Sequence, residues 1–83
     1  MTPEDILRGV ESVATEHLNR PGELHPEMDL VEDLELDSLL LLTLAVEVEN
    51  HFRIQLEDED EVAIRSIGDL VETVRRKLAQ EGR

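Results

Sequence analysis

Eight aliphatic side chains occupy the ten residues from Leu39 to Val48, interrupted only by Thr43 and Glu47. A surface helix needs an apolar arc of only about 100° to pack against a core. This run covers far more than that arc, so a helix formed here must also present apolar side chains outside the core. Phe52 is the only aromatic residue, and the core must therefore be aliphatic.

The start of the chain predicts a helix over residues 3–18. Thr2 can cap it, Pro3 suits its first position, and Asp5 completes a Thr-x-x-Asp capping box. The residues that follow at helical spacing should form its inner face. They are Ile6, Val10, Val13, Ala14 and His17.

Three more helices are predicted further along the chain. The apolar run lies in a helix over residues 37–51, with Asp37 or Ser38 as its N-cap. An acidic run predicts a short helix over residues 58–63, since acidic residues favour helix N-termini. A Ser-x-x-Asp box opens the last helix, residues 67–80. No strand pattern competes, so we predict an all-α fold, a small helical bundle of three main helices plus one short helix.

Residues 19–36 form a long connection that is too apolar for a simple linker. Two prolines and a glycine interrupt it, yet aliphatic and Met side chains recur along its length. These are Leu24, Met28, Leu30, Val31, Leu34 and Leu36. We expect a structured loop pinned to the core, which in a small domain is usually functional.

The charge of the chain excludes several classes of function. With 21 acidic and 8 basic residues, the net charge is −13 at pH 7. This field repels nucleic acid and anionic membranes and favours partners with basic patches. No Cys is present, which excludes disulfides and thiolate catalysis. No apolar run approaches the roughly 18 residues of a membrane span and no signal pattern opens the chain, so we expect a cytoplasmic monomer without membrane insertion.

The acidic and histidine residues do not predict a metal centre or a catalytic site. The carboxylates before Ser38 lack the spacing of a calcium-binding loop, and the three His residues lack the spacing of a ligand set. We expect His17 on the inner edge of the first helix and His25 and His51 on the surface. We assign no catalytic role to any of them.

Ser38 lies where an acidic loop meets the very apolar helix. No His, Lys or Cys lies near it in sequence to activate its hydroxyl. A serine that is exposed and unassisted in this way is better suited to carry an attached group than to act as a nucleophile. The chain would then be a carrier rather than an enzyme, and the chemistry would belong to its partners.

Four segments together resemble the acyl carrier protein family. The strongest is Asp33-Leu-Glu-Leu-Asp-Ser-Leu39, and Phe52 follows 14 residues beyond the serine. The others are Glu47–Ile54, Glu57–Asp60 and Ser66–Leu70, so that the likeness extends from about Thr2 to Leu78. The resemblance implies one acyl carrier domain over residues 1–83.

The resemblance also implies a cofactor and partners. Ser38 would bear 4′-phosphopantetheine, transferred from coenzyme A by a phosphopantetheinyl transferase that needs Mg²⁺. Acyl intermediates of fatty acid, polyketide or related specialised biosynthesis would be carried as thioesters, and acyl-transferring or condensing enzymes would dock. The expected docking residues are Glu35, Asp37, Leu39, Leu40, Leu41 and Glu47. The expected acyl-chain cleft residues are Leu39, Leu42, Val46, Ile54 and Ile64.

Two departures from the family pattern lead to further expectations. Many members have Gly where this chain has Glu35, which suggests a turn that does not need positive φ here. Acidic or small residues that follow Asp-Ser-Leu in many members are replaced by Leu40, Leu41 and Thr43. We expect Leu40 and Leu41 to be exposed and to contact partners with apolar docking sites. Leu39 and Leu42 should pack into the core.

Two alternative functions remain open at this point. One is a peptidyl or aminoacyl carrier of a nonribosomal pathway, although such carriers usually show a Gly-Gly-x-Ser pattern and less acidic residues. The other is an acidic helical interaction module that is never modified.

Overall fold

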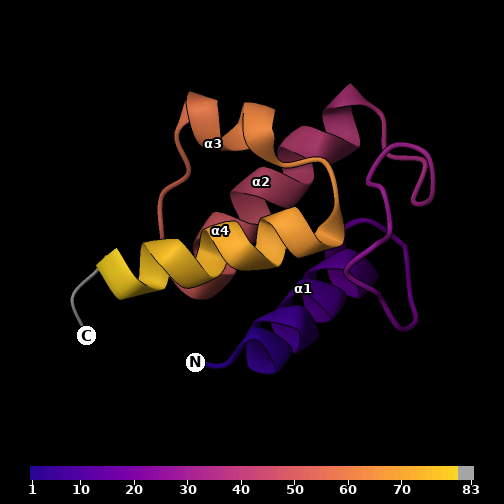
Figure 1. The fold of residues 1–83 in the computed structure, drawn as a ribbon. Helices are drawn as coiled ribbons and strands as arrows, with labels where there is room; N and C mark the ends of the chain where they lie inside the picture. Colours follow the sequence, from indigo (N-terminus) through magenta and orange to yellow (C-terminus); the bar gives the residue numbers. More distant parts are fainter. Residues whose placement is uncertain (81–83) are drawn as a thin grey trace.

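The structure, a computed structural model, describes residues 1–80; residues 81–83 of the expected domain lie outside the described part. It consists of α1 (Pro3–His17), α2 (Ser38–Phe52), α3 (Asp58–Ala63) and α4 (Ile67–Gln80) (Figure 1). The prediction of three main helices and one short helix is confirmed. Each helix begins and ends within one residue of its predicted bounds.

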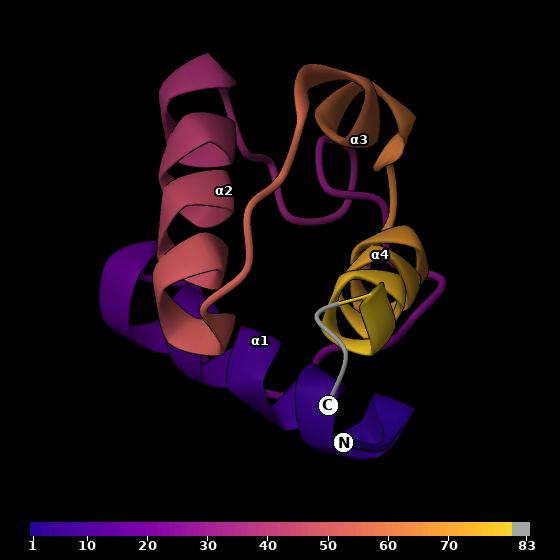
Figure 2. The same cartoon turned by 90° about the vertical axis from the view of Figure 1, so that its left-hand side faces the viewer.

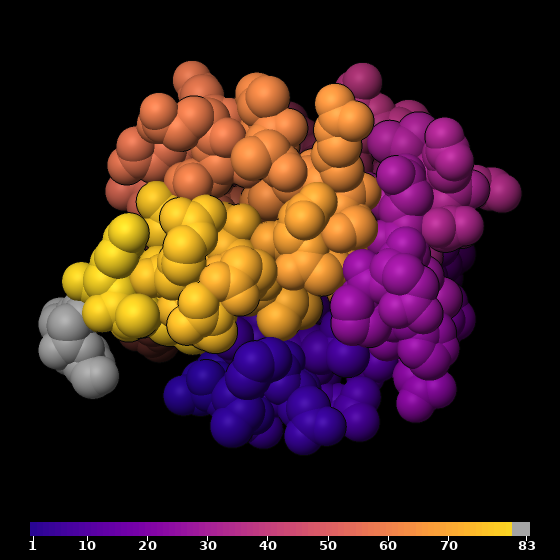
Figure 3. Space-filling view, viewed as in Figure 1, coloured from indigo at the N-terminus to yellow at the C-terminus, as the bar shows by residue number. Residues whose placement is uncertain are grey.

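The three longer helices pack with α1 as the common base. Figure 2 shows α1 running across the bottom of the molecule, with α2 rising from it on the left and α4, seen nearly end-on, above it on the right. The short helix α3 lies over α4 on the side away from α1, as Figure 3 also shows in space-filling form. The core between these elements is aliphatic apart from Phe52, as expected.

The predicted start of α1 is confirmed in detail. The Asp5 N–H donates to the Thr2 hydroxyl at 3.1 Å, and the Thr2 N–H donates to the Asp5 carboxylate at 3.3 Å. Of the predicted inner face, Ile6, Val10, Val13 and Ala14 are buried. His17 is exposed instead, because it is the last residue of α1. Its imidazole lies 3.4 Å from the Glu47 carboxylate of α2. The expectation of an inward-facing His17 was wrong.

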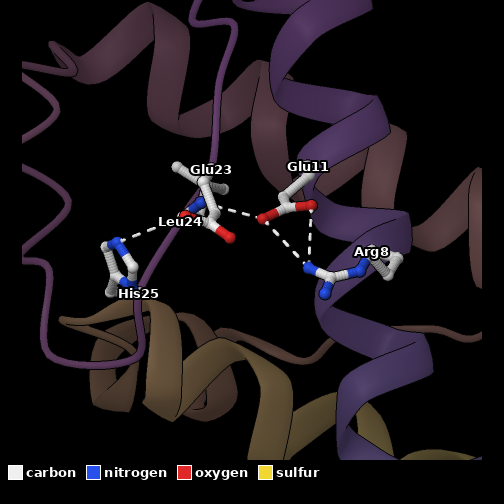
Figure 4. Close-up of polar contacts among 5 residues, drawn as sticks. All are labelled: Arg8, Glu11, Glu23, Leu24 and His25. Atoms are coloured by element: carbon white, nitrogen blue, oxygen red, sulfur yellow. Dashed lines mark hydrogen bonds and ion pairs between the residues drawn. The ribbon is translucent and has the colours of Figure 1, made fainter.

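Residues 18–37 form the long loop between α1 and α2, and its first half is pinned to α1. The Leu24 N–H donates to the Glu11 carboxylate at 2.8 Å, and Leu24 is buried (Figure 4). The Arg8 guanidinium, one turn earlier on α1, pairs with the same carboxylate at 3.3 Å. One side chain of α1 therefore holds the loop backbone, and the burial of Leu24 is the packing on the core that the apolar content of the loop led us to expect.

The second half of the long loop is bonded to the segment that leads into α4. The Leu30 N–H donates to the Arg65 carbonyl at 3.0 Å, and the Ile67 N–H donates to the Met28 carbonyl at 2.9 Å. The Gly68 N–H donates to the Pro26 carbonyl at 2.8 Å. These bonds tie the loop before α2 to the start of α4, so the approach to Ser38 has a fixed shape.

Candidate functional site

Ser38 is the first residue of α2 and is exposed to solvent. Its neighbour Asp37 is the N-cap, and the Asp37 carboxylate accepts from the Leu40 N–H at 2.9 Å. Among the described residues, the Ser38 hydroxyl makes no hydrogen bond. Because Asp37 does the capping, the Ser38 hydroxyl is free for another role.

The first turn of α2 also leaves backbone donors unused beside this hydroxyl. The Leu41 N–H donates to the Asp37 carbonyl, while within residues 1–80 the N–H groups of Ser38 and Leu39 have no partner. Free N–H groups and the positive end of the helix dipole favour an anion at such a position. A phosphodiester on Ser38 would fit these donors.

The backbone just before Ser38 is held in an unusual conformation. The Leu36 N–H donates to the Leu30 carbonyl at 3.2 Å, and Arg20 Nε donates to the Leu34 carbonyl at 2.9 Å. Between these two fixed carbonyl and amide groups, Glu35 adopts φ +56°. The expectation that this turn needs no positive φ was therefore wrong, because distant hydrogen bonds and not the residue type determine it.

Glu35→Gly should stabilise the protein by about 0.5–1 kcal/mol, because glycine adopts the left-handed conformation without a Cβ clash. Chemical denaturation of both forms measures this difference. Glu32→Gly is the matched control: Glu32 is also an exposed acidic residue of the long loop, but its φ is not positive, so glycine should destabilise there. Equal effects at the two positions would contradict the role of φ.

Two acidic side chains of the long loop are committed to the loop itself. The Asp29 carboxylate accepts from the N–H groups of Val31 and Glu32, each at 2.8 Å. These hydrogen bonds, that of Glu32 first, hold the pKa of the Asp29 carboxyl below its usual value. The Asp33 carboxylate accepts from the Asp29 N–H at 2.7 Å. Both carboxylates therefore shape the loop, whereas the exposed carboxylates of Glu32 and Glu35 make no hydrogen bond within residues 1–80.

Among the four leucines that follow Ser38, the pair expected to be buried is exposed and the pair expected to be exposed is half-buried. Leu39 is 69% exposed and Leu42 is 56% exposed, whereas Leu40 and Leu41 are half-buried against the core. The reason is the rotation of α2, which buries Leu44 and residues one and two turns further on. Leu40 and Leu41 lie one turn before that buried face, so the expectation of core packing for Leu39 and Leu42 was wrong.

An open groove of about 480 Å³ begins at Ser38 and runs between α2, α3 and the start of α4. Its aliphatic lining is Leu30, Leu41, Leu42, Leu44, Ala45, Leu56, Val62, Ile64 and Leu70. Its polar lining is Ser38, Asp58 and Glu61. A chain attached at Ser38 could therefore enter an aliphatic space without crossing the surface of the protein.

Only part of this lining was predicted from the sequence. Leu42 and Ile64 line the groove as expected for the cleft, but Leu39, Val46 and Ile54 are not among the lining residues. Leu39 and Val46 are exposed on the outer face of α2, and Ile54 is buried in the core. The aliphatic lining residues that were missed come from α2, α3, α4 and the loops, so the lining depends on the rotation of α2 and on the packing of the whole chain.

The short helix α3 forms one wall of the groove and buries no side chain of its own. A link to α4 holds it: the Asp60 carboxylate is 2.8 Å from Lys77 Nζ and also accepts from the Glu57 N–H at 3.0 Å. The hydrogen bond from Lys77 lowers the pKa of the Asp60 carboxyl, and that from Glu57 adds to it. This wall is thus fixed by polar contacts rather than by packing.

Residues 8–74 match the family model described as the phosphopantetheine attachment site. The chain belongs to the acyl carrier protein family. It is 35% identical over 82 residues to the meromycolate extension acyl carrier protein of Mycobacterium leprae, covering 98% of this chain and 70% of the relative. It is 32% identical over 82 residues to an acyl carrier protein of Rhodococcus erythropolis, covering 98% and 89%.

A solved acyl carrier protein structure supports the same assignment. The crystal structure of the acyl carrier protein from Thermotoga maritima matches with a TM-score of 0.82 at 25% identity, over 95% of this chain and 93% of that chain. Acyl carrier proteins are carriers rather than enzymes. Within the part of the chain that the structure describes, no helix has the length and apolar character needed to cross a membrane.

Proposed function

We propose that this acyl carrier protein holds acyl intermediates as thioesters on a 4′-phosphopantetheine arm attached to Ser38. The observation that carries the proposal is the position of Ser38. It is the exposed first residue of α2, with free N–H groups beside it and an aliphatic groove beginning at its side. It also lies inside the segment that matches the phosphopantetheine attachment model.

An arm at this position would supply a flexible tether that ends in a thiol. Tethering turns delivery of an acyl group into an intramolecular event and raises its effective concentration at each partner's active site. The chain has no Cys, so no side-chain thiol competes with the arm for the acyl group. Coenzyme A is the expected donor of the arm, and Mg²⁺ would be required by the transferase and not by this protein.

The names of the mycobacterial relatives refer to meromycolate extension. This supports a role for the present chain in extending acyl chains for fatty acid or related specialised biosynthesis. A polyketide pathway and an aminoacyl or peptidyl carrier are the remaining alternatives. Charging of the holo protein tests the aminoacyl or peptidyl alternative: transfer of acyl groups is expected, and charging by an adenylating enzyme with an amino acid alone would reverse the choice.

We further propose that partner enzymes dock on the exposed stripe formed by Leu39, Leu42 and Val46 on α2. Glu35 and Asp37 lie before this stripe and Glu47 lies beside it, which gives an apolar centre with an acidic edge. Leu42 lies one turn beyond Ser38 on the same side of α2, and Leu39 follows Ser38 directly, so an enzyme that reaches Ser38 comes close to both. The complementary surface would be an apolar recess edged by Lys and Arg. The half-buried Leu40 and Leu41 are less available for such contact than the sequence suggested.

Leu39→Asp should slow transfer of the arm to Ser38 by about tenfold, the effect of losing one well-packed contact of an interface. Its effect on thermal stability should be small, because the side chain is exposed. Initial rates of holo-protein formation measure this. Val31→Asp is the matched control, since Val31 is an equally aliphatic and exposed side chain on the long loop. An equal slowing by both variants would point to net charge rather than docking.

Incubation with a broad-specificity phosphopantetheinyl transferase and coenzyme A tests the carrier proposal itself. The intact mass should rise by one phosphopantetheine group, and fragmentation should place the addition on Ser38. An unchanged mass would favour the unmodified interaction module.

A further inference from the structure

We infer that the groove beside Ser38 selects unsubstituted alkyl chains and disfavours acyl chains that carry ketone oxygens. This inference rests on the proposed function, because an arm on Ser38 is what would deliver a chain to the groove. It names the chemical class of the cargo, which family membership alone leaves open between fatty acyl and polyketide chains.

The depth of the groove is entirely aliphatic. Its floor consists of side chains that are at most 7% exposed: Leu30, Leu44, Leu56 and Leu70. Half-buried aliphatic side chains, Leu41, Ala45 and Ile64, form its walls. The polar lining residues Ser38, Asp58 and Glu61 are all exposed. A bound chain would therefore leave polar surroundings as it passes the rim.

Below its rim, the described part of the groove offers no free hydrogen-bond donor for a ketone oxygen, which can only accept. The N–H groups of Leu30, Leu56 and Ile64 donate elsewhere, to the Arg65 carbonyl, the Glu49 carboxylate and the Glu61 carbonyl.

The other aliphatic lining residues lie within helices, where N–H groups bond along the helix axis. At the rim, the ionised carboxylates of Asp58 and Glu61 accept only. The Asp58 N–H, which has no partner within residues 1–80, lies at the exposed start of α3 and not in the aliphatic depth. The free N–H of Ser38 lies at the mouth, beside the position of the phosphate.

A ketone carried into this groove would lose its bonds to water and gain none from the protein. An alkyl chain of the same length loses no hydrogen bond and gains from leaving water. This difference in binding between alkyl and ketone-bearing chains is a property of the aliphatic lining, since a single N–H or hydroxyl group directed into the groove would reduce it.

Two acyl groups of equal length provide the test: octanoyl and 5-oxooctanoyl, each loaded from its coenzyme A thioester by the transferase. The octanoyl form should melt above the holo form. The 5-oxooctanoyl form should melt about 4–8 °C below the octanoyl form, the shift expected for about 1 kcal/mol in a domain of this size. Equal melting temperatures for the two acyl forms, or no gain with octanoyl, would overturn the inference.

Ala45→Leu locates the effect in the groove. The larger side chain occupies part of the groove about two turns beyond Ser38 and leaves the exposed residues of α2 unchanged. The octanoyl gain, measured against the holo form of the same variant, should therefore shrink. Ala45→Val serves if the leucine variant does not fold. An undiminished gain in the folded variant would place the chain elsewhere and overturn the inference. Intact mass keeps the two proposals apart: failure to load any group contradicts the carrier function, whereas loading without discrimination contradicts only the selectivity.

Discussion

Ser38→Ala should abolish the phosphopantetheine mass gain completely, because no other hydroxyl in the described structure combines exposure, a helix start and a position at the groove. The loss should occur without a loss of stability. The Ser38 hydroxyl makes no hydrogen bond within residues 1–80, and the N-cap of α2 is Asp37. Intact mass after incubation with transferase and coenzyme A measures the first effect, and thermal unfolding measures the second.

Ser66→Ala is the matched control for this prediction, since Ser66 also lies at the start of a helix. Its hydroxyl accepts from the Asp69 N–H at 3.1 Å, so its removal should cost about 1 kcal/mol of stability while leaving the mass gain intact. The two serines should thus show opposite effects: one supports modification and the other supports folding. A mass gain that survives Ser38→Ala would refute the assignment of the arm to Ser38.

The helix bounds could be predicted because their signals are local. Thr2 and Asp5 form their capping box within one turn, and Ser66 with Asp69 does the same at the start of α4. The acidic α3 was predicted from the preference of carboxylates for helix N-termini, although its link to Lys77 was not. Such features depend on residues three or four apart, which a sequence shows directly.

The orientation of α2 could not be predicted, because aliphatic residues surround most of the helix. When Leu39, Leu40, Leu41 and Leu42 are equally apolar, their pattern does not indicate which of them faces inward. Contacts with α1 are needed to orient the helix, and that of Phe52 with Gly9 joins residues more than forty positions apart. The groove lining was incomplete for the same reason, since it required this rotation to be known.

The conformation of Glu35 also depends on distant contacts. Arg20 bonds the carbonyl of Leu34, and Leu30 bonds the amide of Leu36, so the turn between them is imposed from outside. The presence of Glu instead of Gly at position 35 suggested a backbone with negative φ, but Glu35 adopts the left-handed conformation in the structure. Residues in such conformations cluster near functional sites, where surrounding contacts hold them. Here the site is three residues from Ser38.

Phe52→Ala should lower the free energy of unfolding by about 3–5 kcal/mol, the usual cost of removing a buried aromatic side chain. Phe52 is buried at the end of α2, and its ring lies directly against the backbone of α1 at Gly9. Each kcal/mol shifts the melting temperature of a domain this size by about 4–8 °C. Thermal denaturation should therefore show a melting temperature lower by more than about 10 °C, and chemical denaturation should show the loss of free energy of unfolding directly. Val62→Ala, at a side chain that is 79% exposed, should change stability little.

A double-mutant cycle with Gly9 shows whether the ring contact is the cause. A Cβ atom at Gly9 would lie 2.5 Å from Phe52 Cζ, so Gly9→Ala should destabilise the protein while the ring is present. Once Phe52→Ala has removed the ring, the close neighbour that remains is His51 Nε2 at 3.0 Å, on an exposed side chain that can move away. Alanine should then stabilise α1 by up to about 1 kcal/mol through its helix propensity. The effect of Gly9→Ala should therefore change sign between the two backgrounds. The same sign in both would mean that α1 and α2 are held together by contacts other than this one, and that Phe52 does not set the rotation of α2 that exposes Leu39 and Leu42.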